Sequence, residues 1–488
     1  TANTTASNNT AIGHQSLYAN TTGTENVAVG TYALDANTTP SNMTALGYAA
    51  LSSNTTGTSN VAVGSHSLAA TTTGGSNTAV GKEAGRSNTT GGNNTAVGRS
   101  ALNANTTGGQ NTAIGYQALI ANTASDNTAT GFNALYTNTT GTLNVANGWR
   151  ALYYNTTGSD NVAVGFKSLY SNTTASDNTA VGYEALLSNT TGTLNTAVGQ
   201  GALSTSTTAD NNTAVGRLAL GAATTGGNNT ATGFQALRLN TTGNANAAFG
   251  LYAMLYNTTG IQNVAVGMSA LESNTTASYN TALGYSSLGS NTTGHSNAAV
   301  GYGASNGNTT GVRNTSIGES AGDTLTTGTD SVFLGRVSRP NGATDSNTIV
   351  IGANATGKGS NTGFISPNNG SIYQGNNSSS WATTSDQRLK KNITDSTKGL
   401  TEINQLQVRN FEYRTADEIT ELAATDAVNR SGVQVGVIAQ EIQAIFPDCV
   451  KEESTGVLAV DPDSLTWHMI KAIQELSTQN AALAARLT

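Results

Sequence analysis

The 488-residue sequence has little of the chemistry on which most enzymes rely. It has a single cysteine, Cys449, which excludes an intrachain disulfide and which we expect to be an ordinary buried side chain. Its four histidines, at positions 14, 66, 295 and 468, lie too far apart for a local metal cluster. Acidic residues are too sparse in the first 380 positions for a carboxylate pair that cleaves glycans. We therefore predict no metal and no cofactor.

Charge is also scarce, and its density changes along the chain. Residues 1–380 carry 13 acidic and 11 basic side chains, whereas residues 381–488 carry 15 and 10. The net charges of −2 and −5 leave no basic stripe that would neutralise phosphates, so we predict no nucleic-acid partner. No apolar run approaches the length of a membrane span. The chain opens inside a repeat without a methionine or a signal core, and we expect it to be processed or truncated.

Glycine, in contrast, is abundant and recurs with a fixed short period. The unit reads Asn-Thr-Ala-Val-Gly-x-x-Ala-Leu-x-x-Asn-Thr-Thr-Gly-x-x. Its first glycine returns every 17 residues, with one interval of 16, at 21 positions: 13, 30, 47, 64, 81, 98, 115, 131, 148, 165, 182, 199, 216, 233, 250, 267, 284, 301, 318, 335 and 352. Such a period is typical of a solenoid. The unit is too short for a helix pair and poor in helix formers, so we predict a mainly β fold, a β-solenoid or β-roll over residues 1–352.

Each coil is predicted to hold two short strands, Asn-Thr-Ala-Val and the Ala-Leu segment. Glycine would supply the positive φ of one corner, and Asn-Thr-Thr-Gly would form the other turn. Stacking at ~4.8 Å would align the asparagines at 161, 178, 195, 212 and 229 into a side-chain amide ladder. The inward residues are mainly Ala, Val and Leu, so the core of one chain would be thin, and we expect association of three chains to complete it.

The unit is similar to the head repeats of trimeric autotransporter adhesins, which form trimeric left-handed β-rolls. That resemblance implies a homotrimer. The period here is longer, which leaves the handedness and the trimer packing open.

The residue that follows each repeat glycine is the one position of the unit whose identity varies systematically from coil to coil. Large side chains often occupy it, and five consecutive coils carry Tyr116, Phe132, Trp149, Phe166 and Tyr183. Such a ridge would suit stacking on a cell-surface glycan or contact with a protein receptor. A tolerant outer or interchain position is the alternative reading.

A serine precedes a lysine by five residues where the array gives way to the charged tail, in the string Thr384-Ser385-Asp386-Gln387-Arg388-Leu389-Lys390. Lys390 would take the hydroxyl proton of Ser385 only if burial or nearby cations lowered the pKa of a lysine from ~10.4 towards roughly 7 to 8. The alternative is that Ser385 caps a helix whose first turns carry solvated cations.

The tail from about residue 380 to 488 resembles the intramolecular chaperone of endosialidase family, the self-cleaving C-terminal domain of phage tail fibres and tailspikes. The resemblance rests on the serine-lysine string, a closing amphipathic helix and, between them, the strings Phe411-Glu412-Tyr413-Arg414, Gly436-Val437-Ile438-Ala439-Gln440-Glu441-Ile442 and Phe446-Pro447. It implies a small α+β domain that trimerises three chains and is then cut at the Ser385-Asp386 bond, with Ser385 as nucleophile and Lys390 as its base.

A direct attack by Ser385 on its own carbonyl would close a strained four-membered ring. Action on a neighbouring chain of the trimer and orientation of a water molecule both remain open.

The last predicted helix, at about 463–487, suits threefold assembly. Its heptads place Thr466, Ile473, Asn480 and Leu487 at a, and Met469, Leu476 and Leu483 at d. This pattern predicts a short coiled coil in which Asn480 fixes the register. A helix packed on its own domain has similar spacing.

The sequence thus predicts a homotrimeric structural fibre. Its parts are a solenoid of about 21 coils at 1–352, a Gly/Asn/Ser-rich transition at 353–380 and a chaperone and autoprotease domain at 381–488. We expect a phage tail fibre, on the virion or outside the cell, that cleaves itself but turns over no external substrate. The alternatives are a bacterial surface adhesin or extracellular filament subunit and a fibre of a contractile injection system. A glycan depolymerase would need a catalytic domain that the sequence does not show.

Overall fold

The structure, a computed structural model, describes residues 4–366, 372–374, 385–421, 428, 430–452 and 456–487. It divides into two compact units, Thr1–Thr384 and Ser385–Thr488. Of the transition expected at 353–380, residues 367–371 and 375–380 lie outside the described residues. Among the helices described, none is long and apolar enough to cross a membrane.

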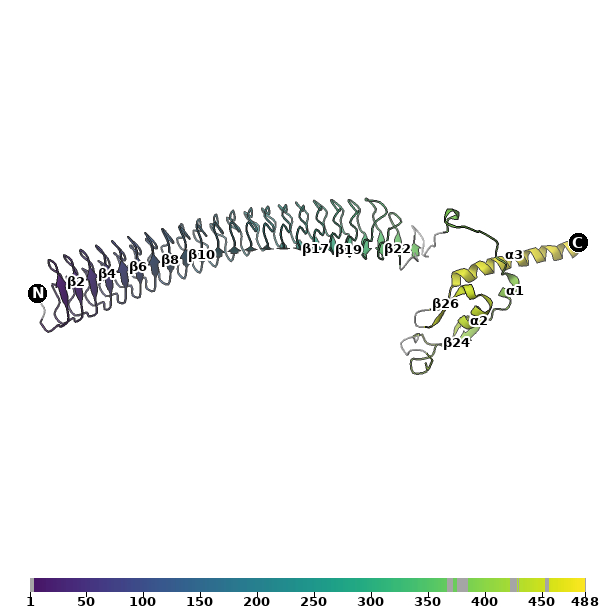
Figure 1. Cartoon of the computed structure of the whole chain (residues 1–488), viewed down its shortest axis with the longest axis horizontal. Helices are drawn as coiled ribbons and strands as arrows, with labels where there is room; N and C mark the ends of the chain where they lie inside the picture. The colour runs from purple at the N-terminus through teal and green to yellow at the C-terminus, as the bar shows by residue number, and fades with distance from the viewer. Residues whose placement is uncertain are drawn as a thin grey trace. The chain divides into compact units, whose positions relative to one another are not determined.

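The first unit is a β-solenoid in which each coil contributes one three-residue strand, and the coils stack in chain order (Figure 1). The strands are β1 (Thr10–Ile12), β2 (Val27–Val29), β3 (Thr44–Leu46), β4 (Val61–Val63), β5 (Thr78–Val80), β6 (Thr95–Val97), β7 (Thr112–Ile114), β8 (Thr128–Thr130), β9 (Val145–Asn147), β10 (Val162–Val164), β11 (Thr179–Val181), β12 (Thr196–Val198), β13 (Thr213–Val215), β14 (Thr230–Thr232), β15 (Ala247–Phe249), β16 (Val264–Val266), β17 (Thr281–Leu283), β18 (Ala298–Val300), β19 (Thr315–Ile317), β20 (Val332–Leu334) and β21 (Ile349–Ile351). The predicted 17-residue solenoid is confirmed.

Neighbouring strands pair in parallel with equivalent residues opposite each other, as in Thr179↔Thr196 and Ala180↔Ala197. The single short interval is absorbed between β7 and β8, where Thr112 pairs with Thr128. Beyond β21, β22 (Gly363–Ile365) adds one more parallel strand, and β23 (Ile372–Gln374) pairs with β22 in the antiparallel sense. The sheet therefore continues into the segment that follows the last repeat glycine.

The repeat glycine closes the corner after each strand. The φ angles of these glycines lie between 124° and 144°, a region that side chains with a Cβ rarely adopt. At Gly182, an added Cβ would lie 2.6 Å from the carbonyl oxygen of Gly199 in the next coil. Glycine is thus required for both the corner angle and the close approach of successive coils.

The Ala-Leu segment is not a strand, and the expectation of two strands per coil was wrong. Leu186, in a representative coil, has a φ of 51°, which breaks extended backbone. The segment instead forms a tight turn whose leucine side chain is fully buried and whose Leu186 N–H donates to the carbonyl of Ala202 in the next coil (3.0 Å). A buried leucine therefore satisfies the apolar pattern without being in a strand.

Two columns of asparagine run through the interior. In the first, which confirms the predicted ladder, Asn178 Oδ1 accepts hydrogen bonds from Asn195 Nδ2 (3.2 Å) and from its backbone N–H (3.0 Å). In the second, Asn189 Nδ2 donates to Asn172 Oδ1 and to the carbonyl of Gly192, both at 2.9 Å. Fully buried amides thus link coil to coil, and they need these partners because an unpaired buried amide is costly.

The apolar core is complete within one chain. The central alanine of the strand and the turn leucine, such as Ala180 and Leu186, have no exposed surface, and one cluster of such residues runs from Leu17 to Ala304. A second cluster around Phe333 and Phe364 closes the C-terminal end of the array. Stacking of coils therefore buries the alanine and leucine of the unit, whereas the last residue of the strand, expected to point inward, stays partly exposed, as at Val198 and Val215.

The second unit is small and mixes helix with strand. Its elements are η1 (Gln387–Leu389), α1 (Leu400–Ile403), β24 (Arg409–Phe411), β25 (Gln434–Gly436), α2 (Ala439–Ile445), η3 (Pro447–Cys449), β26 (Val450–Glu452), β27 (Leu458–Val460) and α3 (Pro462–Leu487). Its buried core consists of Ile442, Phe446 and Cys449. Cys449 is buried as predicted, and α3 spans the helix expected at about 463–487.

The second asparagine column is interrupted, and each interruption leaves a buried amide oxygen without a partner among the described residues. Thr71, Ser206 and Leu325 replace the next asparagine and leave the Oδ1 atoms of Asn54, Asn189 and Asn308 without a partner. Asn105 Oδ1 is also unpartnered, because across the short interval Asn122 Nδ2 donates to the carbonyl of Ala124 instead. The hydroxyls of Thr71 and Ser206 are also buried without partners. After Ser206 the column stays open for one more coil, because Ala223 holds the following position.

Thr71→Asn is expected to stabilise the array, because the new amide would donate to Asn54 Oδ1 and accept from Asn88. Each unpartnered buried group costs about 1 to 3 kcal/mol, so the midpoint of denaturant unfolding should rise measurably. Ser206→Asn alone should give little gain, since it only moves the orphaned oxygen one coil along. Adding Ala223→Asn to it should close the column and restore the gain. Thr191→Asn, at an exposed turn position, is the control. If all the variants shift the unfolding midpoint equally, the asparagine column does not stabilise the array in this way.

Candidate functional site

The predicted dyad residues are in contact. Lys390 Nζ lies 2.6 Å from Ser385 Oγ and donates a hydrogen bond to it. The short helix η1 creates this contact, because its single turn folds the chain back between the two residues. Asp386 caps η1 by accepting from the backbone N–H of Arg388 (2.9 Å). The sequence spacing of five is thus converted into a direct side-chain contact.

The residue after the expected scissile bond is held by an ion pair. Arg388 reaches Asp386 with Nε (3.0 Å) and with Nη2 (2.6 Å). These hydrogen bonds lower the pKa of the Asp386 carboxyl below its usual range. Asp386 is therefore a carboxylate already engaged by Arg388 at neutral pH.

Ser385 and Lys390 are both exposed in the single chain. Water therefore solvates the lysine ammonium, which donates to the hydroxyl, whereas a general base must accept the hydroxyl proton. The structure thus brings the two predicted dyad residues into contact, in an arrangement where the lysine donates to the hydroxyl. The predicted roles of nucleophile and base would require a change in their surroundings.

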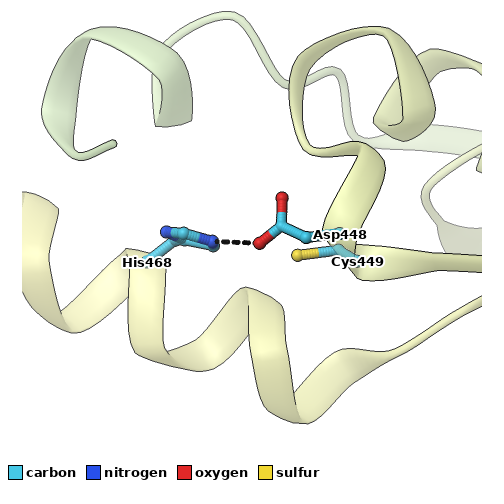
Figure 2. A group of neighbouring side chains, drawn as sticks. All are labelled: Asp448, Cys449 and His468. Carbon is cyan, nitrogen blue, oxygen red and sulfur yellow. Dashed lines mark hydrogen bonds and ion pairs between the residues drawn. The ribbon is translucent and has the colours of Figure 1, made fainter. Parts of the chain in front are cut away.

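A second group of polar side chains joins η3 to α3 (Figure 2). The ligand atoms of Asp448, Cys449 and His468 all lie within 4.8 Å of one another. His468 Nε2 donates to Asp448 Oδ2 (3.1 Å), which lowers the pKa of the Asp448 carboxyl, and burial raises the pKa of the Cys449 thiol. Sequence spacing missed this group because only the histidines were compared.

The group has donor types that bind zinc, but its surroundings favour a structural contact. Lys398 Nζ lies 3.7 Å from Asp448 Oδ1, so a cation already neutralises that carboxylate. A thiol must lose its proton to bind a metal, and burial of Cys449 opposes this. His468 also packs against Phe446, with 4.6 Å between ring centroids. We interpret the group as a clamp that holds α3 on its domain.

Two alternatives were expected for the last helix, a coiled coil and a helix packed on its own domain, and each describes one part of α3. Near its start, Met469, Ala472 and Leu476 line an apolar groove of about 270 Å³ together with Leu400 and Ile403 of α1. Further along, Leu483 and Leu487 are 55% and 81% exposed, and Asn480 is exposed. The first turns of the helix therefore pack on their own domain, while the later heptad positions have no apolar cover from the described residues.

The aromatic ridge of the array forms one continuous stack. Ring centroids of Tyr116, Phe132, Trp149, Phe166 and Tyr183 follow one another at 5.2, 6.2, 4.8 and 5.1 Å, with neighbouring planes within 12° of parallel. Sequence reasoning missed a neighbouring stack of Tyr136, Tyr153 and Tyr170. The signal was present, since these tyrosines all follow the turn leucine of consecutive coils.

Comparison with known proteins bears on the second unit. Residues 385–451 match the family model described as chaperone of endosialidase. The match starts at Ser385, the residue at which the second compact unit also starts. The resemblance inferred for the tail is thereby confirmed.

A stretch of 103 residues is 30% identical to myelin regulatory factor homolog 1 of Caenorhabditis elegans. It covers 21% of this chain and 11% of that protein. The similarity therefore concerns one segment and not the whole of either protein.

The contact between Ser385 and Lys390 predicts the outcome of two substitutions. Full-length chain expressed alone should yield fragments that end at Ser385 and begin at Asp386, whereas Ser385→Ala and Lys390→Ala should stay intact. Lys391→Ala is the matched control, because it removes an adjacent exposed cation and should leave cleavage unchanged. Intact-protein mass spectrometry gives the result directly. Cleavage of both dyad variants at the wild-type rate would show that the pair is not the cleaving group.

Proposed function

We propose that this chain is a structural fibre protein whose C-terminal unit promotes trimerisation and folding and then cleaves itself at Ser385-Asp386. The observation that carries the proposal is the contact of Ser385 with Lys390 at the first residues of the segment that matches the chaperone of endosialidase family. A solenoid array followed by such a segment fits a tail fibre or tailspike. A phage tail fibre, on a virion tail or outside the cell, is the assignment that we favour.

The apolar residues of the later part of α3 support association of three chains. Leu483 and Leu487 are exposed in one chain, and burying them against neighbouring helices would remove apolar surface from water. Asn480 at an a position would fix the register of such a coiled coil at some cost in stability. Three helices joined in this way would hold the junctions at Ser385 in one complex.

Assembly also supplies a reason for timed cleavage. Lys390 is exposed in the single chain, and removal of water by a neighbouring chain would favour its neutral, proton-accepting form. The hydroxyl of Ser385 would then be activated only in assembled chains. A neighbouring chain also offers a carbonyl, or a site for an oriented water, that avoids the strained ring of self-attack.

Other fibres remain alternatives to a phage tail fibre. A bacterial surface adhesin, an extracellular filament subunit and a fibre of a contractile injection system would all use a long solenoid with an assembly domain. A domain that attaches the chain to a baseplate would indicate a fibre of a virion or of an injection particle. A signal peptide with a membrane anchor would instead indicate a protein of the bacterial cell surface. Release of sugars from capsule polysaccharide would instead favour a depolymerase.

Deleting residues 386–488 from the gene should leave the array unable to assemble, whereas removing the tail after assembly should leave the trimer intact. The reason is kinetic, because three chains must align near-identical coils in one register, and slipped pairings have similar energies. Sedimentation velocity on both preparations is the measurement. Soluble, heat-resistant trimers from the truncated gene would contradict the chaperone role.

Asn480→Leu should raise the thermal stability of the assembled chain while broadening its oligomeric state, because a buried amide selects one register at the expense of apolar burial. Gln479→Leu, one position away from the proposed seam, is the matched control. Thermal melts and sedimentation equilibrium of full-length protein would report both effects. If the wild-type chain sediments as a monomer at every concentration, both the coiled coil and the proposed trimerisation of the tail are wrong.

A further inference from the structure

One stretch of the array has aromatic side chains in two adjacent columns. The first column is the stack Tyr116, Phe132, Trp149, Phe166 and Tyr183, at the position after the repeat glycine, and the second is Tyr136, Tyr153 and Tyr170, after the turn leucine. We call these eight residues the aromatic patch. Elsewhere in the described array, aromatic rings meet only in pairs or in a short edge-to-face row near the N-terminus. The patch is therefore a local feature and not a property of the repeat.

Two cations lie between the columns of the aromatic patch. The guanidinium of Arg150 lies 4.4 Å from the ring centroid of Trp149 and 5.2 Å from that of Tyr153. Lys167 Nζ, one coil further on, lies 5.7 Å from Trp149 and 5.4 Å from Tyr170. Each cation thus bridges the two columns, and the pair follows the direction in which the coils stack.

These charges are not compensated within the patch. Neither Arg150 nor Lys167 forms an ion pair with any carboxylate of the described residues. Arg150 Nε is buried and has no hydrogen-bond partner there, so ring faces are its main surroundings. Glu184 occupies the equivalent position in the next coil and ends the run of positive charge. An anionic group lying over the patch would find two unpaired cations about one coil spacing, ~4.8 Å, apart.

We propose that the aromatic patch binds an acidic polysaccharide that lies along the stacking direction of the coils. Pyranose rings would pack on the exposed edges of the aromatic side chains, whose faces are covered by neighbouring rings within the stack, and carboxylates of successive sugars would pair with Arg150 and Lys167. This deepens the receptor-binding part of the proposed fibre function and rests on it, but it does not depend on self-cleavage. The five rings of the first column are 36% to 47% exposed, so they are accessible to such a ligand in the single chain.

The architecture favours a sugar chain over a peptide. An extended peptide gains much of its affinity by adding a strand to a free sheet edge. The strands beneath the patch, β8 to β11, are each paired on both sides, so they offer no free edge. A polysaccharide needs no such edge, because its repeated rings and charges match side chains that repeat once per coil. The stacked rings are also fixed by their neighbours, which reduces the entropy lost on binding.

The test uses the full-length chain and three polymers in binding titrations at low salt. Alginate carries both sugar rings and carboxylates, dextran carries rings without charge, and poly-glutamate carries charge without rings. Alginate should bind, and the other two should bind at least ten-fold more weakly. Equal binding of dextran or of poly-glutamate, or no binding of alginate, would overturn the proposal.

Variants locate the binding. Lys167→Gln and Trp149→Ala should each weaken alginate binding at least ten-fold, whereas Lys167→Arg should retain it because it keeps the charge. Arg217→Gln is the matched control, since Arg217 lies over the single ring of Phe234 in another coil. Unfolding midpoints and sedimentation of every variant identify those that are misfolded or have changed association. The proposal is overturned if Lys167→Gln and Trp149→Ala bind alginate as tightly as the wild type. It is also overturned if the only effect of these substitutions is a changed association state, because the patch would then have another role. Loss of alginate binding with intact assembly and cleavage leaves the proposed fibre function standing.

Discussion

The hydrogen bonding of each coil to the next, residue upon equivalent residue, is the constraint on which the array depends. It brings the backbones so close at the corner that only glycine fits, as Gly182 against Gly199 illustrates. It also buries polar asparagines whose side-chain oxygens are satisfied by the equivalent residue one coil away, as in the pair Asn178 and Asn195. The same stacking gives a core of small side chains, because alanine and leucine from successive coils fill the narrow interior. One geometric requirement thus explains the glycine, the asparagine and the apolar positions of the repeat.

That regularity has a cost in specificity. A coil stacks on any other coil of the same sequence nearly as well as on its true neighbour, so the array itself holds little information about register between chains. The irregular features of the first unit include the short interval before β8, the interruptions at Thr71, Ser206 and Leu325, and the aromatic patch. The second unit differs in having a compact core, a polar clamp and an exposed apolar helix end. Under the proposed function, this second unit would supply the information about chain register that the repeats lack.

The repeat allowed the solenoid, its period, the glycine corner and the asparagine ladder to be predicted, because each follows from one residue type at one position. The conformation of the Ala-Leu segment was not predictable from the apolar pattern, since a leucine in a left-handed turn and one in a strand both bury their side chains. In the tail, the contact of Ser385 with Lys390 was expected from the family resemblance. The clamp of Asp448 with His468 was not, because its residues are 20 positions apart and meet only when α3 packs on η3.

The junction at Ser385 and the clamp of α3 illustrate how solvent controls the chemistry of polar groups. Asp448 and His468 lie at a helix contact, where the His468 side chain is largely buried, and the Asp448 carboxylate, itself 55% exposed, accepts its hydrogen bond beside Lys398. Ser385 and Lys390, joined by a hydrogen bond of 2.6 Å, are both exposed, so water competes for the bond between them. Under the proposed mechanism, the residues of the cleavage site are therefore in place before assembly, and the step that assembly adds is desolvation. The bond that ends the fibre would then break only after the fibre has formed.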